Sequence, residues 1–168
     1  MKNNTIRGRV HKYGDNINTD LINPSPSINL DRALMNAAAM RGVDPDFTKN
    51  VRPGDIIVAG KNFGCGSSRE TAPIVIKENG VSAVIADFFA RIFYRNCINI
   101  GLTVLTTDQT SRISHGDELE VDTQLGIIYN ITKGEQYNCT KLPENVQKLV
   151  DDGGLIEHLK KNVAQNNK

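Results

Sequence analysis

Residues 60–71, GKNFGCGSSRET, form the stretch from which both the fold and the function of this chain can be approached. Three glycines, two adjacent serines and an arginine follow an apolar run at Ile56–Ala59 and precede a helical pattern that begins at Pro73. Glycines at this density allow tight bends and close approach of the backbone. The stretch therefore predicts a bent, exposed segment between a buried strand and a helix. We refer to residues 60–70 as the glycine loop.

The segments on both sides of the glycine loop predict a parallel α/β core. Apolar runs at 56–59, 81–86 and 102–105 are typical of buried strands, and helical patterns at 73–79 and 88–96 lie between them. Strands that alternate with helices favour crossover connections and a parallel sheet.

The N-terminal third contributes one predicted strand and one predicted helix. Thr5–Tyr13 alternates as a strand does, and Asp31 can cap the helix that follows it. Residues 16–29 are rich in Asn, Pro and Ser, which predicts irregular structure. Residues 43–49 predict a loop or a short turn.

The last third predicts antiparallel hairpins and short terminal helices. Turns separate its alternating segments, and Gly153-Gly154 separates two helical ones. The predicted strands are 119–122, 127–132 and 136–140, and the predicted helices are 146–150 and 155–159. Residues 162–168 predict a frayed tail. The fold class is therefore α/β, with a parallel crossover core and added antiparallel hairpins in a single domain over residues 1–168.

Bulk composition argues against several classes of function. With 39% hydrophobic and 23% charged residues, a chain of 168 residues can bury a core of its own. A net charge of +1 and the absence of tryptophan give no basis for binding nucleic acid or an acidic membrane. The three cysteines lack metal-site spacing, and no apolar run is long enough for a signal peptide or a membrane span. We therefore expect a cytoplasmic protein.

Ser67 has a structural and a functional interpretation, and the sequence leaves both open. Ser67-x-x-Glu70 matches a capping box, in which the hydroxyl would only satisfy the first amides of the next helix. Pro73 argues against a helix that starts at Ser67, because proline removes an intrahelical hydrogen bond and disfavours helical geometry at Ala72. Pro73 is instead well suited to the first position of the helix.

The glycine loop does not match a nucleotide-binding motif. Gly60 and Gly64 lack the Lys-Ser/Thr pair of a P-loop, and the dinucleotide pattern fails because Arg69 stands where its third glycine should be. The loop amides and Arg69 are suited to a carboxylate. A serine acting as nucleophile or base would need activation, and no histidine lies near it in the sequence, so a hydrolase triad has little support.

Three segments, in order and at family-like spacing, carry a resemblance. They are DNINTDLINP (15–24), GDIIVAGKNFGCGSSRETAP (54–73) and FFARIFYRNCINIGL (88–102). Together they resemble the small subunits of 3-isopropylmalate dehydratase, also known as isopropylmalate isomerase, which form the swivelling domain of the aconitase superfamily. The resemblance runs from about Ile6 to Leu159, and GCGSSRE is its most specific part. It implies the swivelling β/β/α fold of the aconitase C-terminal type.

The resemblance implies roles for four residues. In aconitase-like enzymes the serine at the position of Ser67 is the base that removes a proton from a substrate carbon. The positions of Ser68 and Arg69 bind and orient substrate carboxylates. Asp20 matches the aspartate of the family's T-D-x-I-x-P segment and is expected at the edge of the active site. Its structural alternative is a turn residue that bonds to its own backbone.

The same resemblance implies a partner and a cofactor. The family's large subunit carries a 4Fe–4S cluster whose open iron polarises the leaving hydroxyl and supplies the positive field that a serine base needs. This chain is therefore expected to ligate no metal and to be active only with a large subunit. Cys65 and Cys97 are expected to be packing thiols, and Cys139 a strand residue.

The sequence departs from the family where the substrate side chain is selected. Ser27 replaces an aromatic residue of the loop that follows Pro24, and Thr71 stands where many relatives carry histidine. Arg32 is the nearest arginine that can serve a second substrate carboxylate, and an exposed helix cation is its alternative role. Dehydration of a 2-hydroxy dicarboxylate is compatible with these changes, whereas the identity of its side chain stays open.

The expected function is that of the small subunit of a hydro-lyase that interconverts 3- and 2-isopropylmalate in leucine biosynthesis. The alternatives within the same chemistry are the small subunits of 2,3-dimethylmalate dehydratase, homoaconitase or a citramalate isomerase. The alternative from another class is a non-catalytic module that binds an anion or a protein partner.

Overall fold

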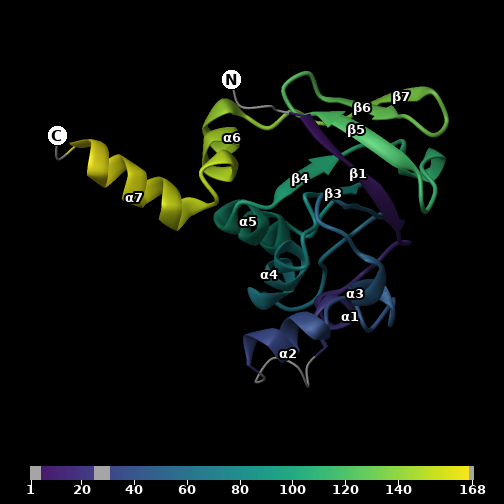
Figure 1. The fold of residues 1–168 in the computed structure, drawn as a ribbon, viewed down its shortest axis with the longest axis horizontal. Coiled ribbons are helices and arrows are strands. Elements are labelled where there is room, and N and C mark those ends of the chain that lie inside the picture. The colour runs from purple at the N-terminus through teal and green to yellow at the C-terminus, as the bar shows by residue number, and fades with distance from the viewer. Residues whose placement is uncertain (1–4, 25–30, 167–168) are drawn as a thin grey trace.

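A mixed seven-stranded sheet in the order β4-β3-β2-β1-β5-β6-β7 organises the computed structural model, which describes residues 5–24 and 31–166 (Figure 1). The strands are β1 (Thr5–Lys12), β2 (Ile56–Val58), β3 (Ala83–Ala86), β4 (Thr103–Thr106), β5 (Glu118–Asp122), β6 (Ile127–Asn130) and β7 (Glu135–Asn138). Strands β1 to β4 are parallel, and β1, β5, β6 and β7 pair antiparallel. The predicted parallel core and added antiparallel hairpins are both confirmed.

Strand β1 joins the two halves of the sheet. Its first residues pair antiparallel with β5, with Ile6 opposite Val121, and its last residues pair parallel with β2, with Val10 opposite Ile56. One eight-residue strand therefore serves both as the first strand of the crossover core and as the edge on which the hairpins build.

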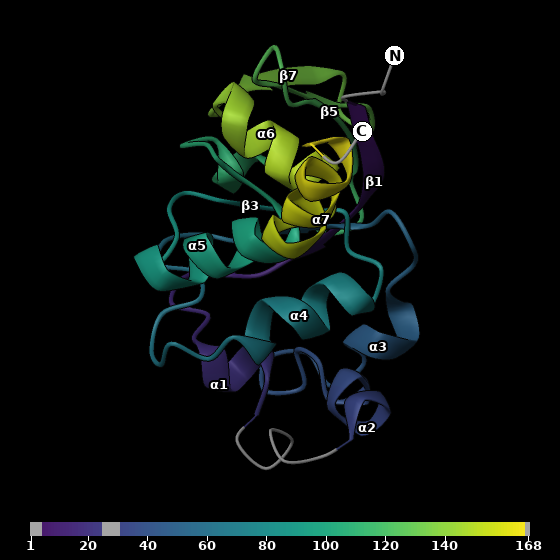
Figure 2. The same cartoon turned by 90° about the vertical axis from the view of Figure 1, so that its left-hand side faces the viewer.

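The helices lie mainly on one side of the parallel half. They are α1 (Thr19–Ile22), α2 (Arg32–Ala37), α3 (Phe47–Asn50), α4 (Thr71–Glu78), α5 (Arg91–Ile100), α6 (Glu144–Asp151) and α7 (Leu155–Asn166), with a 3₁₀ turn at Thr110–Arg112. Figure 2 shows α4 and α5 stacked between the sheet and the small helices α1 to α3, and Figure 1 shows that α7 projects from the body. Within the described ranges, no helix combines the length and apolar character that crossing a membrane requires.

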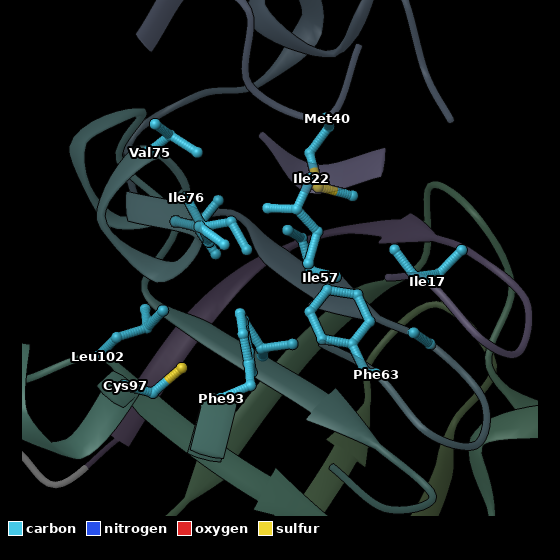
Figure 3. Close-up of a cluster of buried hydrophobic side chains, with 14 of the residues drawn as sticks. Ile17, Ile22, Met40, Ile57, Phe63, Val75, Ile76, Phe93, Cys97 and Leu102 are labelled. Carbon is cyan, nitrogen blue, oxygen red and sulfur yellow. The ribbon is translucent and has the colours of Figure 1, made fainter. Parts of the chain in front are cut away.

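Both faces of the parallel strands are buried, which explains their uninterrupted apolar sequence. On one face, Ile57 and Val84 pack with the helices in the cluster drawn in Figure 3. On the other face, Ile56 and Ile85 pack against side chains of the antiparallel strands, including Leu119. The runs that predict buried strands therefore lie between two hydrophobic layers.

Three local predictions were wrong or incomplete. Residues 16–29 were predicted to be irregular, but Thr19–Ile22 forms α1, which begins because the Asn18 side chain accepts a hydrogen bond from the Leu21 amide at 2.9 Å. Phe47–Asn50 forms a further single turn of helix in the predicted 43–49 loop region. The final helix was predicted to end at Leu159, but α7 extends to Asn166.

The start of α4 also differs from the prediction. The helix begins at Thr71, so Pro73 is its third residue rather than its first, and Ala72 is helical. Proline is tolerated there because the amides of the first four helical residues have no intrahelical acceptor in any case. The predicted cap at Asp31 is confirmed, since its side chain accepts a hydrogen bond from the Leu34 amide at 3.0 Å.

The close approach of β1 to the turn before β2 generates a stability prediction. A Cβ atom at Gly8 would lie 2.0 Å from the Gly54 carbonyl oxygen, whereas a Cβ atom at Gly14 would meet nothing within 4 Å. We expect Gly8→Ala to lower the free energy of unfolding by about 1–3 kcal/mol, because the backbone must move to relieve the overlap. Urea denaturation measures this change. The control Gly14→Ala should stay within about 0.5 kcal/mol of the parent protein, and equal effects of the two substitutions would contradict the packing of β1 described here.

Candidate active site

The glycine loop continues the pairing of β1 and β2 beyond the ends of both strands. The Gly64 amide donates to the Ile17 carbonyl at 2.7 Å, and the Thr19 amide donates to the Cys65 carbonyl at 2.8 Å. Asn18 and Cys65 form an isolated parallel bridge. These contacts join residues that are 46 or 47 positions apart in the sequence, and they fix the segments 15–20 and 61–69 side by side at the carboxyl edge of the parallel strands.

Phe63 and Gly64 attach the other side of the loop to the core. Phe63 is fully buried, its carbonyl accepts a hydrogen bond from the Ala90 amide at 2.9 Å, and its ring centroid lies 5.4 Å from that of Phe93. Gly64 has a φ of +79°, and a Cβ atom there would lie 2.1 Å from Cγ of Phe93. Glycine is required at this position by both the backbone conformation and the contact with α5.

Ser67 lies on the exposed side of this anchored loop. Its Oγ is 3.1 Å from Oγ1 of Thr19, and its amide donates to the same Thr19 oxygen at 3.2 Å. Glu70 is the N-cap residue of α4 and makes no side-chain capping bond. The interpretation of Ser67 and Glu70 as a simple capping box is therefore wrong, because the Ser67 hydroxyl contacts Thr19 across the loop.

Arg69 connects the glycine loop to α1. Its side chain is only 15% exposed, and Nη1 donates to the Asn23 carbonyl at 2.7 Å and pairs with Oδ1 of Asp20 at 2.7 Å. Asp20 itself is 63% exposed, and Ser68 is exposed beside Ser67. The structure thus brings together four predicted site residues, Ser67, Ser68, Arg69 and Asp20, at one edge of the sheet.

Arg32 lies apart from this group. It forms a two-pronged ion pair with Glu78, in which Nε donates to Oε2 at 2.7 Å, and Asn36 donates to the same carboxylate at 2.6 Å. Glu78 is the last residue of α4, about 10 Å along the helix from the end that adjoins the glycine loop. Arg32 therefore has the geometry of an exposed helix cation, which was its alternative role.

The residues that depart from the family pattern divide into two cases. Ser27, predicted to influence substrate choice, falls outside the residues that the structure describes. Thr71 accepts a hydrogen bond from the Asn23 side chain at 2.6 Å. Thr71 and Arg69 therefore both hold Asn23, Thr71 at the Asn23 side chain and Arg69 at the Asn23 backbone carbonyl.

Thr19 is the residue of this site that sequence analysis missed. It is 2% exposed and contacts both the amide and the hydroxyl of Ser67. Its place directly before Asp20 in the TDLINP segment marks Thr19 as a neighbour of a predicted site residue. Nothing in the sequence alone shows that its side chain faces the glycine loop.

The cysteines differ in environment. Cys97 is fully buried in α5, and burial raises the pKa of its thiol well above the ordinary value. Burial also raises the pKa of the Cys139 thiol to about 11. Cys65 lies in the glycine loop and is partly exposed. Within residues 5–24 and 31–166, no group of three or more His, Cys, Asp or Glu side chains is arranged to hold a metal ion.

The fold and this loop define a class of protein. Residues 6–110 match the family model of the aconitase C-terminal domain, and the chain belongs to that family. Within it, the chain groups with the small subunits of 3-isopropylmalate dehydratase. It is 54% identical over 157 residues to the 3-isopropylmalate dehydratase small subunit of Clostridium botulinum, an alignment that covers 92% of this chain and 98% of the relative.

Two proteins of Methanocaldococcus jannaschii extend the comparison. The chain is 50% identical to the isopropylmalate/citramalate isomerase small subunit, over 95% of this chain and 96% of that one. The crystal structure of a 3-isopropylmalate dehydratase from the same organism superposes with a TM-score of 0.92 at 42% identity, covering 97% of this chain and 98% of that chain. These findings confirm the predicted resemblance and the predicted fold class.

The different environments of Arg69 and Arg32 predict different losses of folding stability when each is replaced by alanine. We expect Arg69→Ala to lower the free energy of unfolding by about 2 kcal/mol, because it removes a charged donor from the carbonyl of the buried residue Asn23. Arg32→Ala should cost less than about 1 kcal/mol, since its guanidinium is 56% exposed. Urea denaturation of both variants measures the difference, and an equal or reversed order would contradict the described anchoring of the glycine loop.

Proposed function

We propose that this chain is the small subunit of a cytoplasmic two-chain hydro-lyase that interconverts 3-isopropylmalate and 2-isopropylmalate through 2-isopropylmaleate, a step of leucine biosynthesis. The observation that carries the proposal is the exposed Ser67–Arg69 segment, fixed at the sheet edge in a chain that matches 3-isopropylmalate dehydratase small subunits over nearly its whole length. Ser67 is exposed where a partner can complete the site, while the backbone beneath it is held by the core.

In the proposed reaction, Ser67 acts as the base. Its deprotonated Oγ removes a proton from the substrate carbon next to the one that bears the hydroxyl. The electrons of that C–H bond form the carbon–carbon double bond, and the hydroxyl leaves as water after taking a second proton from an acid on the large subunit. Rehydration with the opposite regiochemistry returns the proton from Ser67 to the other carbon and gives the isomer.

Ser68 and Arg69 are proposed to bind substrate carboxylates, with Asp20 at the edge of the site. A guanidinium binds a carboxylate through parallel charge-assisted hydrogen bonds. Asp20 pairs with Nη1 of Arg69 at 2.7 Å, so the carboxylate contributes to holding the guanidinium in place. We do not include Arg32 among the substrate-binding residues, because its guanidinium pairs with Glu78 at the far end of α4.

The large subunit is proposed to carry the 4Fe–4S cluster. When bound, the cluster would act as a Lewis acid on the departing hydroxyl. The contribution of this chain is to present the base and carboxylate-binding groups. The partner must therefore cover the exposed side of the glycine loop, which also excludes water from the reacting carbon.

Citramalate is the second candidate substrate. The specific observation in its favour is the 50% identity to a small subunit whose name includes both isopropylmalate and citramalate. The two substrates share the 2-hydroxy dicarboxylate and differ in the alkyl group, so the proposed roles of Ser67, Ser68 and Arg69 are the same for both.

The test of the proposed function is an anaerobic reconstitution. The chain is mixed with its cluster-loaded large subunit, and the unsaturated acid is followed by ultraviolet absorbance with 3-isopropylmalate, citramalate, 2,3-dimethylmalate and homocitrate. We expect activity that requires both chains and is highest, by kcat/KM, with 3-isopropylmalate. A preference for another acid would retain the chemistry and change the substrate. No turnover of any acid by a formed complex with an intact cluster would support the non-catalytic module instead.

The adjacent serines give a matched pair of variants for the proposed roles. We expect Ser67→Ala to lower kcat by at least about 100-fold, since it removes the base. Ser68→Ala should mainly raise KM, because it removes a hydrogen bond to the bound substrate. Steady-state kinetics of the reconstituted enzyme separate the two effects, and circular dichroism and gel filtration check folding and assembly. Near-normal kcat in Ser67→Ala would exclude Ser67 as the base.

A further inference from the structure

Thr19 occupies an unusual position beneath the proposed base. Its Oγ1 lies 3.1 Å from Oγ of Ser67 and accepts the Ser67 amide at 3.2 Å. Its side chain is buried, with the residue only 2% exposed, whereas Ser67 is exposed on the opposite side. Thr19 therefore approaches the Ser67 hydroxyl from the protein interior and leaves the outer side open to a substrate.

We propose that Thr19 is a positioning residue that orients the Ser67 hydroxyl and stabilises its deprotonated form by donating a hydrogen bond to it. The inference rests on the proposed function, because it assigns the group through which the base of that reaction is held. Thr19 itself does not reach the reacting atoms in this proposal. It acts only through Ser67.

The direction of the hydrogen bond follows from the protons available. A threonine hydroxyl has one proton to donate and can accept through its lone pairs. Oγ1 of Thr19 already accepts from the Ser67 amide, so its own proton remains for a different acceptor. While Ser67 is protonated, either hydroxyl can be the donor. Once Ser67 has lost its proton its oxygen can only accept, and the bond must run from Thr19 to Ser67.

Thr19 is bonded to the glycine loop through its backbone as well as through its side chain. Its amide donates to the Cys65 carbonyl at 2.8 Å, two residues before Ser67. A Cβ atom at the intervening Gly66, whose φ is +101°, would lie 3.3 Å from Oγ1 of Thr19. Thr19 is thus held on both sides of Gly66, by a backbone hydrogen bond to Cys65 and by the bond from the Ser67 amide to its hydroxyl, and these two contacts place the two hydroxyls close together.

The stabilisation is selective for the reactive form. A hydrogen bond to an ionised oxygen is about twice as strong as one between neutral groups. The Thr19 hydroxyl therefore favours the deprotonated state of Ser67 over the protonated state, which is the kind of differential interaction that raises kcat. A threonine is also restricted about χ1, so little conformational freedom is lost when it holds this geometry.

The test compares Thr19→Val with Thr19→Ser in the complex reconstituted with the cluster-loaded large subunit. Valine keeps the shape and removes the hydroxyl, and we expect kcat to fall about 10- to 100-fold while KM changes less than about twofold. Without the donor the deprotonated hydroxyl is less stable, so the acid limb of the kcat–pH profile should move to higher pH. Thr19→Ser restores the donor and should return kcat and the pH profile close to those of the parent enzyme.

A double-mutant comparison separates the inference from the proposed function. If Thr19 acts only through Ser67, Thr19→Val should cause no further loss of turnover in the Ser67→Ala background. A parent-like kcat and pH profile in Thr19→Val, with Ser67→Ala inactive, would overturn the role of Thr19 and leave Ser67 as the base. A raised KM with an unmoved pH profile, or no rescue by serine, would also overturn it. Full activity of Ser67→Ala would overturn the proposed base itself.

Discussion

The backbone pairing of residues 15–20 with the glycine loop is the constraint on which the candidate site depends. It extends the register of β1 and β2 past the strands, so the positions of Ser67 and Arg69 follow from the same alignment that builds the core. Ligand sites of open α/β sheets occur at the carboxyl ends of the parallel strands, where loops are held by the sheet but are not part of it. Because Gly64 has no side chain, the loop backbone packs directly against Phe93 of α5.

The same pairing explains how a reactive group can be exposed without being mobile. Phe63 is buried in the core, and four residues later Ser67 is open to solvent. Between them, the Gly64 amide and the Cys65 carbonyl are hydrogen-bonded to the 15–20 segment. A loop residue whose preceding backbone is hydrogen-bonded at two points loses little further freedom when a partner or substrate binds, and this lowers the entropic cost of forming the complete site.

Most of the fold could be predicted from the sequence because its signals are long or regular. Continuous apolar strands such as Ala83–Ala86 predict burial on both faces, and turns separate the antiparallel strands. Helix α1 was missed because four residues give no periodicity, and the start of α4 was misplaced because proline is allowed at several positions of a first turn. Thr19 was missed for a different reason: a contact across 48 residues depends on strand register, which a local pattern does not contain.

The electrostatics of the site explain why this chain needs a partner for the proposed chemistry. Arg69 is the cation nearest in sequence to Ser67, but its charge is already paired with Asp20 and its Nη1 donates to the Asn23 carbonyl. Thr19 can orient the Ser67 hydroxyl and favour its ionised form, yet one hydrogen bond is far too small to ionise a serine in solvent. The remaining stabilisation must come from positive charge and exclusion of water on the exposed side of the loop. Under the proposed function, the isolated chain therefore holds a correctly oriented but protonated base, and assembly with the large subunit is the event that makes it reactive.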